Sequence, residues 1–282
     1  MLDAVFSFVV DADPKYVLQG LHLAKSLLLH TGTMKKRIFA QVTPDVDMCA
    51  RAIFRRLGCE LYQIERFGDG RYCNKLNQFE RLRGLEYRYA ILMDTDILVL
   101  RSLGELLKGS RLRARVVGEA RPSRGVLEFL ARASGLAKLP SLAIADCTGG
   151  DTLEGNLNGG LYVVPRDLLA TMEGAWKHWT MWLLERREIL AEEGNAHHVD
   201  QVGLWLAIHH EKLPWEALPA NWNYNPARLH RSYVGALPIS IVHYHTALDS
   251  AGQINLPDAP ALNRDVIAAA NTQISSFRDT LF

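Results

Sequence analysis

Asp94 and Asp96, separated by one residue, follow the apolar run Tyr-Ala-Ile-Leu-Met at positions 89–93. A short run of this kind is typical of a strand that is buried on both faces, and open α/β sheets bind ligands at the carboxyl ends of such strands. In an extended chain, residues i and i+2 point the same way, so both carboxylates could reach one cation. Carboxylate oxygens suit Mg²⁺ or Mn²⁺, which also accept phosphate oxygens. A solvated turn capped by an aspartate would show the same pattern, which alone does not decide between the two.

The elements that must position this pair alternate between strand and helix. Residues 6–10 fit a buried strand, and Asp13 with Pro14 then provides an N-cap followed by proline at the first helical position. Further strands are predicted at residues 37–42, 61–64, 89–93, 160–164 and 239–244, and helices at residues 14 to about 32, 46–57, 74–82, 126–133, 165–184, 199–208 and around 266–270. This alternation predicts an α/β fold with a mostly parallel central sheet flanked by helices.

The chain shows no internal repeat, low-complexity tract or linker, so one domain over residues 1–282 is expected. We expect a nucleotide- and metal-binding half at about 1–118, an acceptor-side half at about 119–255 and a terminal helix at about 256–282. Residues 134–156 are rich in glycine and weakly periodic, and long irregular loops inside compact domains are usually binding loops or lids.

Composition excludes several classes of protein. Of 282 residues, 48% are hydrophobic and 22% charged, which is too apolar for a disordered chain. The net charge of +1 gives no basic field that would attract nucleic acid or an anionic membrane. The first residues lack the basic region of a signal peptide, and no stretch of 18 uncharged apolar residues predicts a transmembrane segment. Four cysteines without CxxC spacing predict reduced thiols, so a cytoplasmic protein is expected; the oligomeric state is not indicated.

Seven segments stand in a defined order along the chain: FVVDADPKYVLQGLHLAKSL, NKLNQFERL, DTDILVLRSLGELL, NLNGGLYVVPRDLL, HHVDQVGLWLA, LPANWNYN and IVHYHTAL. This ordered set resembles the retaining glycosyltransferases of family 8, which include glycogenin and the bacterial lipopolysaccharide galactosyl- and glucosyltransferases. Each segment alone is weakly specific, but they follow one another in the family's order. The resemblance implies a GT-A-type fold, a nucleotide-binding α/β sandwich.

The resemblance also implies an activity and roles for individual residues. A hexose would move, with retention of anomeric configuration, from a nucleotide-diphosphate sugar (expected to be UDP-linked) to a hydroxyl of a sugar, polyol or protein. Mn²⁺ or Mg²⁺ would be held by Asp94, Asp96 and His243. Nucleotide-sugar contacts are expected from Val10, Asp11, Tyr16, Lys75, Asp94, Asn158, Gly159 and His245, and catalytic roles from Asp200 and Gln201.

The chemistry requires these residue types in its own right. Breaking a sugar–diphosphate bond leaves negative charge on the phosphate, which a divalent cation and a lysine such as Lys75 stabilise. The family usually ends in H-x-x-G-x-x-K-P-W, whereas this chain has HYHTALDSAG and lacks that lysine. We therefore expect His245, or a basic residue elsewhere, to bind the diphosphate, with His245 also competing with His243 as the metal ligand. No second carboxylate is placed as a nucleophile, so front-face attack aided by the leaving phosphate is expected.

Alternatives remain at this stage. Several site residues also have a purely structural interpretation: Lys75 as a solvated helix lysine, His243 as a core histidine, Gly159 as part of a simple turn, Asp200 as a helix-start residue and Tyr16 as a core-edge aromatic. The tryptophans at 176, 179 and 182 are expected to serve packing rather than sugar binding. A catalytically inactive sugar-nucleotide-binding homologue is the main alternative because of the missing lysine. A phosphatase with an aspartyl nucleophile is disfavoured. In those enzymes the D-x-D motif follows the first strand, whereas in this chain it lies about a third of the way along. The later acidic pair of those enzymes is also absent from this chain.

Overall fold

Seven strands form the central sheet, in the order β10-β6-β9-β4-β1-β2-β3. The structure is a computed structural model and describes residues 2–32 and 34–281. The strands are β1 (Leu2–Val10), β2 (Lys36–Val42), β3 (Glu60–Gln63), β4 (Tyr87–Met93), β6 (Leu112–Ala114), β9 (Leu161–Pro165) and β10 (Trp215–Ala217). All neighbouring pairs are parallel except those of β9, which runs antiparallel to β4 and β6. The predicted α/β fold with a mostly parallel sheet is therefore confirmed.

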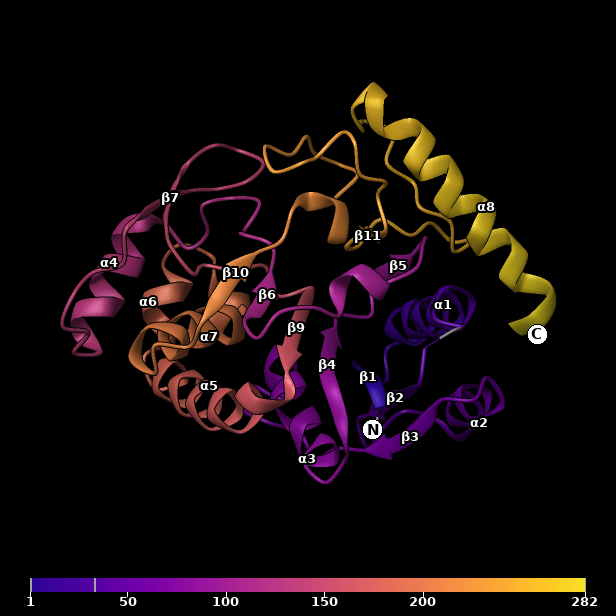
Figure 1. The fold of residues 1–282 in the computed structure, drawn as a ribbon, viewed down its shortest axis with the longest axis horizontal. Helices are drawn as coiled ribbons and strands as arrows, with labels where there is room; N and C mark the ends of the chain where they lie inside the picture. Colours follow the sequence, from indigo (N-terminus) through magenta and orange to yellow (C-terminus); the bar gives the residue numbers. More distant parts are fainter. Residues whose placement is uncertain (1, 33, 282) are drawn as a thin grey trace.

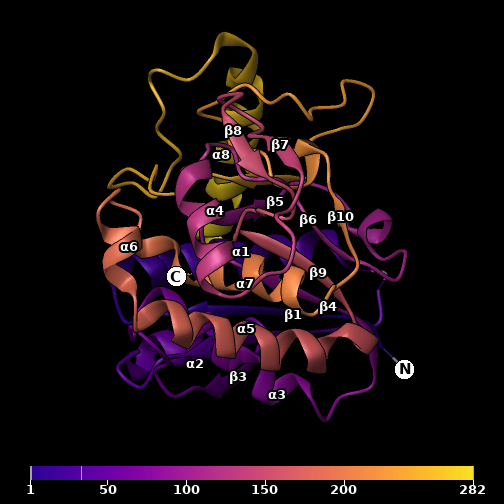
Figure 2. The ribbon, with the colours of Figure 1, turned by 90° about the vertical axis from the view of Figure 1, so that its left-hand side faces the viewer.

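Each face of the sheet is covered by its own apolar cluster, because successive side chains of a strand point to opposite faces. On β1, Phe6 and Phe8 pack into a cluster with α1, α2 and α8, whereas Val5 packs into a cluster with α3, α4, α5 and α7. Figure 1 shows α5 and α7 on one side of β4 and β9, and α1 and α2 on the other. Figure 2 gives the view from the side of α5. The central strands are thus buried on both faces, as their continuous apolar runs predict.

The helices are α1 (Pro14–His30), α2 (Met48–Arg56), α3 (Phe79–Leu82), α4 (Arg124–Ala133), α5 (Leu169–Leu184), α6 (Arg187–Ala191), α7 (Val199–His210) and α8 (Arg264–Leu281). The predicted start of α1 is confirmed, since the Asp13 carboxylate accepts a hydrogen bond from the backbone N–H of Lys15 at 2.8 Å. The structure contains no helix long and apolar enough to cross a membrane within the residues it describes. The tryptophans at 176 and 179 are buried in the core, which confirms their packing role.

One predicted helix, at residues 74–82, is wrong in its first part. Tyr72–Gln78 is a 3₁₀ segment, and only Phe79–Leu82 is α-helical. Side chains hold the tight start of this segment: the Asn74 side chain accepts from the backbone N–H of Phe67 at 2.9 Å and donates to the carbonyl of Gly70 at 2.9 Å. Such local side-chain bonds compete with regular helical bonding.

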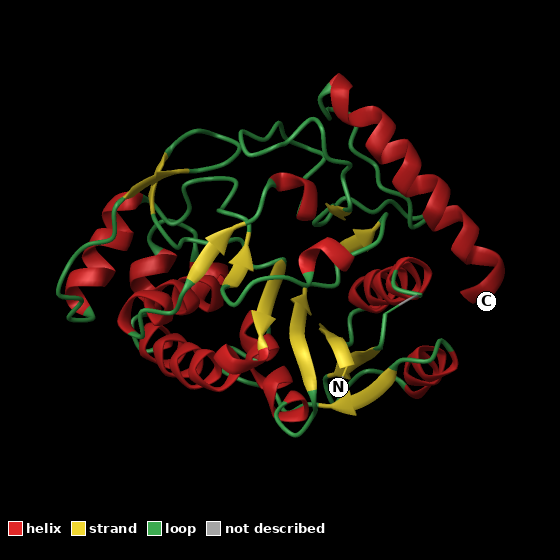
Figure 3. Ribbon diagram, in the orientation of Figure 1, coloured by secondary structure: helices red, strands yellow, loops and turns green. Residues whose placement is uncertain are grey.

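Two small sheets lie outside the central one (Figure 3). A hairpin of β7 (Leu142–Ile144) and β8 (Asp151–Leu153) occupies the region predicted to be irregular, because three-residue strands are too short to show periodicity. The predicted strand at 239–244 is shorter, β11 (Ile241–His243), and pairs antiparallel with β5 (Ile97–Val99). In this pairing His243 lies opposite Ile97, immediately after the D-x-D motif.

Candidate functional site

Asp94 and Asp96 lie where β4 ends, at the carboxyl edge of the central sheet, but not in an extended chain. A turn at residues 95–96 separates β4 from β5. The backbone N–H of Asp94 donates to the carbonyl of Gly160 at 3.0 Å, and the N–H of Tyr244 donates to the carbonyl of Asp96 at 3.1 Å. The two carboxylates have different partners as a result. The expectation of an extended chain through both aspartates is therefore wrong, whereas the binding of one cation by both carboxylates stays a prediction.

Asp94 belongs to a partly buried ionic group around Lys75. The Lys75 ammonium lies 2.7 Å from Asp94 Oδ1 and 3.1 Å from Asp200 Oδ2, and it also approaches the carbonyl of Gly159 at 3.5 Å. Burial lowers the pKa of Lys75, but the two carboxylates outweigh it and raise the pKa well above its ordinary value. Lys75 is therefore a cation held by two carboxylates. Contact between Lys75 and a donor phosphate stays a prediction.

His243 is oriented by two asparagines. The backbone N–H of Gly160 donates to Asn158 Oδ1 at 3.1 Å, which identifies that atom as the acceptor, and Asn223 Nδ2 donates to the same oxygen at 2.9 Å. Asn223 Oδ1 is left to accept from His243 Nδ1, 2.9 Å away. This assignment follows from the hydrogen-bond network, because hydrogens are not observed directly. With its proton on Nδ1, a neutral His243 presents the lone pair of Nε2.

This lone pair points at another acceptor. His243 Nε2 lies 3.2 Å from Asp96 Oδ1, a buried oxygen that receives no hydrogen bond from any described residue. Two acceptors so close repel each other unless a proton or a metal ion lies between them. His245 adds a third donor atom, with Nδ1 3.9 Å from Asp96 Oδ2, and one ligand atom from each of the three residues falls within 4.8 Å of the others. A proton needs only two partners, so the third donor favours a metal ion.

The donor set indicates which cations fit. Two imidazole nitrogens and one carboxylate suit Mn²⁺ and other first-row transition metals better than Mg²⁺, which prefers oxygen ligands. Without a metal ion, a proton takes this position. Burial raises the pKa of Asp96, but the charge and hydrogen bond of a protonated His243, and then His245, outweigh it and lower the pKa, so the carboxylate is ionised. The charge of the protonated His243, and then burial, lowers the pKa of His245 to about 3. His245 is therefore neutral near pH 7, which does not support its expected role as a cationic phosphate donor.

The glycines before β9 leave space for both groups. A Cβ at Gly160 would overlap the His243 ring, and a Cβ at Gly159 would come within 3.4 Å of the Lys75 ammonium. The segment Asn158–Gly160 thus approaches the histidine and the lysine together. The close approach of these side chains therefore requires small residues here, which a simple turn would not.

The predicted nucleotide end lies where β1 ends. Val10 is fully buried, so its side chain serves the core. The Asp11 carboxylate accepts from the backbone N–H of Ala12 at 2.7 Å and pairs with Arg66 at 3.2 Å. Tyr16 is 40% exposed, and its pKa is raised first by partial burial and then by neighbouring acidic groups that include Asp11 and Asp96. Asp11 and Tyr16 therefore lie at the same edge as the candidate metal ligands.

A cleft of about 410 Å³ adjoins this edge. Its lining includes Asn158, Gln201 and His245, together with Arg115 and Cys147. Gln201 is largely buried, and its Nε2 donates to Asn156 Oδ1 at 3.4 Å.

The structure brings together most of the predicted site residues. Asp94, Lys75, Asp200 and Gly159 form one group, and Asp96, His243 and His245 form another, with Asn158 between them. Two residues with structural roles at the site were not among the predicted ones, namely Asn223 and Gly160. Both occur in segments that carry the family resemblance, so the pattern N-W-N and the second glycine were the available signals.

Known proteins resemble this chain in structure. No protein-family model matches the sequence, and no curated protein sequence matches it either. Among solved structures, the chain is similar to the galactosyltransferase LgtC in complex with donor and acceptor sugar analogues, with 14% identity, a TM-score of 0.57 and 95% of each chain covered. An active-site variant of LgtC gives 13% identity and a TM-score of 0.59, over 96% of this chain and 95% of that one. Mouse xyloside xylosyltransferase 1 gives 11% identity and a TM-score of 0.52, over 86% and 98%. These similarities show that the fold is that of GT-A glycosyltransferases.

Proposed function

We propose that this protein is a metal-dependent glycosyltransferase, related to family 8, that moves a hexose from a UDP-linked or similar nucleotide-diphosphate sugar to a hydroxyl acceptor with retention of configuration. The observation that carries the proposal is the pair of facing acceptors, His243 Nε2 and Asp96 Oδ1, 3.2 Å apart beside the cleft. Their position at the carboxyl edge of the sheet is where α/β folds bind nucleotides.

The chain's own residues divide the work. Asp96 and His243 would hold Mn²⁺, with His245 beside them, and the bound ion would neutralise charge on the donor diphosphate. Asn223 keeps the metal-facing nitrogen of His243 free of its proton. We assign Asp94 to the donor sugar rather than to the metal, because Lys75 holds its Oδ1 and it lies outside the group of three donors.

The groups on the sugar side support a reaction without a covalent intermediate. Asp94 and Asp200 both pair with Lys75, and the neighbouring positive charge lowers the nucleophilicity of each carboxylate. Lys75 fixes the two carboxylates and reduces their mutual repulsion, while Asp200 and Gln201 position the hexose. Front-face attack by the acceptor hydroxyl, with the leaving phosphate accepting its proton, is consistent with this arrangement.

A second candidate is a homologue that binds sugar nucleotides without turning them over. The observation that favours it is the engagement of Lys75 by two carboxylates together with the neutral His245, since both had been expected to supply charge to the diphosphate. The two candidates share the binding step and differ only in transfer.

The test is a thermal-shift panel of nucleotide sugars with Mn²⁺ or with chelator, on the wild type and on Asp96→Asn. A ligand at a hundred times its Kd adds about 2.7 kcal/mol of stability, roughly a 5 °C rise in Tm for a chain of this size. We expect this rise only with Mn²⁺ and only in the wild type. Equal shifts in chelator would overturn the metal dependence. Product analysis by NMR then separates the candidates: a product with the donor's anomeric configuration supports transfer with retention, and binding without product supports the second candidate.

A further inference from the structure

Cys147 lies in the loop between β7 and β8 and lines the same cleft as Asn158 and Gln201. Its backbone N–H donates to the carbonyl of Gly118 at 2.8 Å, and a Cβ at Gly118 would come within 2.9 Å of the Cys147 Sγ. The cysteine is half-buried. A small molecule in the cleft can therefore reach a thiol that the proposed transfer reaction does not use.

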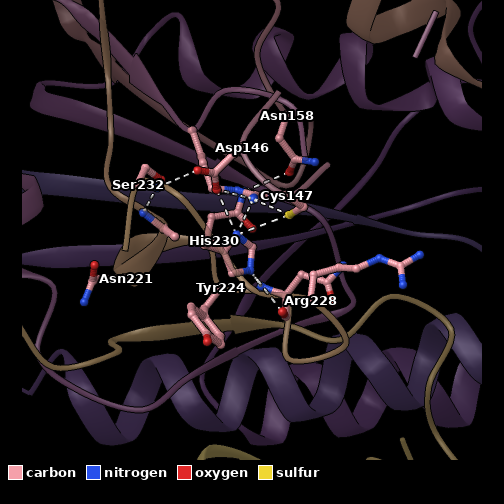
Figure 4. A network of polar contacts seen from close by, with 12 residues as sticks. Asp146, Cys147, Asn158, Asn221, Tyr224, Arg228, His230 and Ser232 are labelled. Carbon is pink, nitrogen blue, oxygen red and sulfur yellow. Dashed lines mark hydrogen bonds and ion pairs between the residues drawn. The ribbon is translucent and has the colours of Figure 1, made fainter. Parts of the chain in front are cut away.

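This thiol belongs to a charged network (Figure 4). Asp146 Oδ2 accepts hydrogen bonds from Arg115 NH1 at 3.0 Å and from His230 Nδ1 at 2.8 Å. The Cys147 Sγ lies 3.4 Å from His230 Nδ1 and 3.8 Å from Arg115 NH1. Arg115 is only 2% exposed, and its Nε has no hydrogen-bond partner among the described residues. The network therefore holds a buried guanidinium whose hydrogen-bonding capacity is not fully used.

Positively charged groups lie close to the sulfur. Burial lowers the pKa of His230, but its hydrogen bonds to Asp146 and Cys147 outweigh this and raise the pKa to about 8. Near pH 7 the network thus contains the positive charges of Arg115 and His230 and the single negative charge of Asp146. Reactive cysteines are found in partly exposed, electropositive surroundings of this kind.

A metal ion does not suit the network. Ligand atoms of Asp146, Cys147 and His230 do lie within 4.8 Å of one another. However, the guanidinium of Arg115 lies among them, 3.0 Å from Asp146 Oδ2 and 2.9 Å from His230 Nδ1. A cation at this point would be repelled by the guanidinium.

The other cysteines provide internal references. Burial raises the pKa of Cys59 to about 12 and that of Cys73 far above its ordinary value, so both are unreactive in the folded protein. Cys49 is exposed on α2, beside the capping carboxylate of Asp47, which bonds its backbone N–H. Cys49 therefore reports the reactivity of an accessible thiol outside the network.

We propose that Cys147 is a modification site that reacts with low-molecular-weight disulfides, and that the resulting mixed disulfide obstructs the cleft. The Cys147 thiolate attacks one sulfur of the disulfide, a new S–S bond forms to that half, and the other half leaves as a thiolate that takes up a proton. The adduct would lie beside Asn158 and Gln201 in a space of about 410 Å³. Excess thiol reverses the exchange, so the cleft responds to the thiol–disulfide balance around the protein.

The reactivity is tested with the aromatic disulfide DTNB at limiting concentration, with each modified cysteine identified by peptide mass spectrometry. We expect Cys147 to react first, Cys147→Ser to lose the fast phase and Cys49→Ser to lose only the slower one. His230→Gln should slow the fast phase about three- to tenfold, because one neighbouring positive charge is removed. Equal rates at Cys147 and Cys49 would overturn the proposal.

A second measurement keeps the test independent of the folding of the variants. In the wild type, the rate at Cys147 relative to Cys49 should fall above about pH 8, as His230 loses its proton. The charged and titratable groups around His230 are Asp146, Arg115, Cys147 and Tyr224. A ratio that stays constant through this range would contradict the role of His230.

The effect on transfer rests on the proposed function, whereas the reactivity does not. Oxidised glutathione should inhibit transfer by the wild type and by Cys49→Ser, dithiothreitol should restore it, and Cys147→Ser should keep its own untreated rate. Modified Cys147 with unchanged transfer would overturn the obstruction. If the untreated protein transfers no sugar, the proposed function fails, and the DTNB experiment still decides the reactivity of Cys147.

Discussion

Replacing Asn223 by alanine tests whether the hydrogen-bond network, and not merely the presence of His243, prepares the metal site. The Asn223 side chain accepts from His243 Nδ1 at 2.9 Å and donates to Asn158 Oδ1 at 2.9 Å, and it is fully buried. In Asn223→Ala the imidazole loses the acceptor that keeps its proton on Nδ1. A proton on Nε2 must then leave before that nitrogen can bind a metal.

The expected loss of affinity follows from the loss of orientation. Removing a partner that orients a ligating histidine typically weakens metal binding 10- to 100-fold, or about 1.4–2.8 kcal/mol. Leaving the buried His243 Nδ1–H without an acceptor should also lower the free energy of unfolding by about 1–3 kcal/mol. We therefore expect both quantities to fall. Mn²⁺ titration calorimetry measures the first, and urea unfolding without metal measures the second.

A matched variant separates the two effects. Asn271 accepts from the backbone N–H of Ile254 at 2.7 Å and donates to its carbonyl at 2.9 Å, away from the candidate metal ligands. Asn271→Ala should lower stability to a comparable degree and leave Mn²⁺ affinity unchanged. If Asn223→Ala binds Mn²⁺ as tightly as Asn271→Ala does, the network does not prepare the site and the reasoning is refuted.

Two further predictions concern pH and packing. Because the pKa of His230 is raised to about 8 from its ordinary 6.5, its contribution to stability is complete below pH 6.5 and is lost as the pH rises through 8. The unfolding free energy should fall by about 2 kcal/mol over this window in the wild type but not in His230→Gln, and parallel profiles in urea titrations would contradict this. Gly160→Ala should displace the His243 ring, costing about 1–3 kcal/mol and weakening Mn²⁺ binding. Gly174 lies in α5, and nothing lies within 4 Å of a Cβ added there, so Gly174→Ala should raise the free energy of unfolding by about 0.4–1 kcal/mol. Similar unfolding curves for the two alanine variants would refute the overlap between a Cβ at Gly160 and the His243 ring.

Much of the fold could be predicted because its signals are local. The strand at residues 89–93 is a continuous apolar run, and the start of α1 combines an N-cap with a proline, so neighbouring residues alone identify both. The hairpin of β7 and β8 could not be predicted, because each of its strands has only three residues. The 3₁₀ segment Tyr72–Gln78 depends on bonds from the Asn74 side chain to residues up to seven positions away, which helical periodicity does not reveal.

In the site, the residue types could be predicted from the sequence, but the way they pair could not. Sequence spacing indicated the carboxylates at the end of β4, and the family resemblance indicated Lys75 and the two histidines near β11. The structure brings all of them to one edge. The sequence could not reveal that Lys75 pairs with Asp94 and Asp200. The three residues come from different elements, and their pairing depends on contacts at hydrogen-bond distance. Asn223 was missed because its role depends on a contact with His243, which lies 20 residues further along the chain.

The turn after β4 gives the two aspartates different electrostatic surroundings. Asp94 lies against a cation, Lys75, which it shares with Asp200, so this side of the site carries its own positive charge. Asp96 lies against two imidazoles, and His243 Nε2 faces it, so a metal ion on this side would take the place of a proton. Under the proposed function, this division would let one short motif serve the sugar through Asp94 and the diphosphate through a metal ion at Asp96.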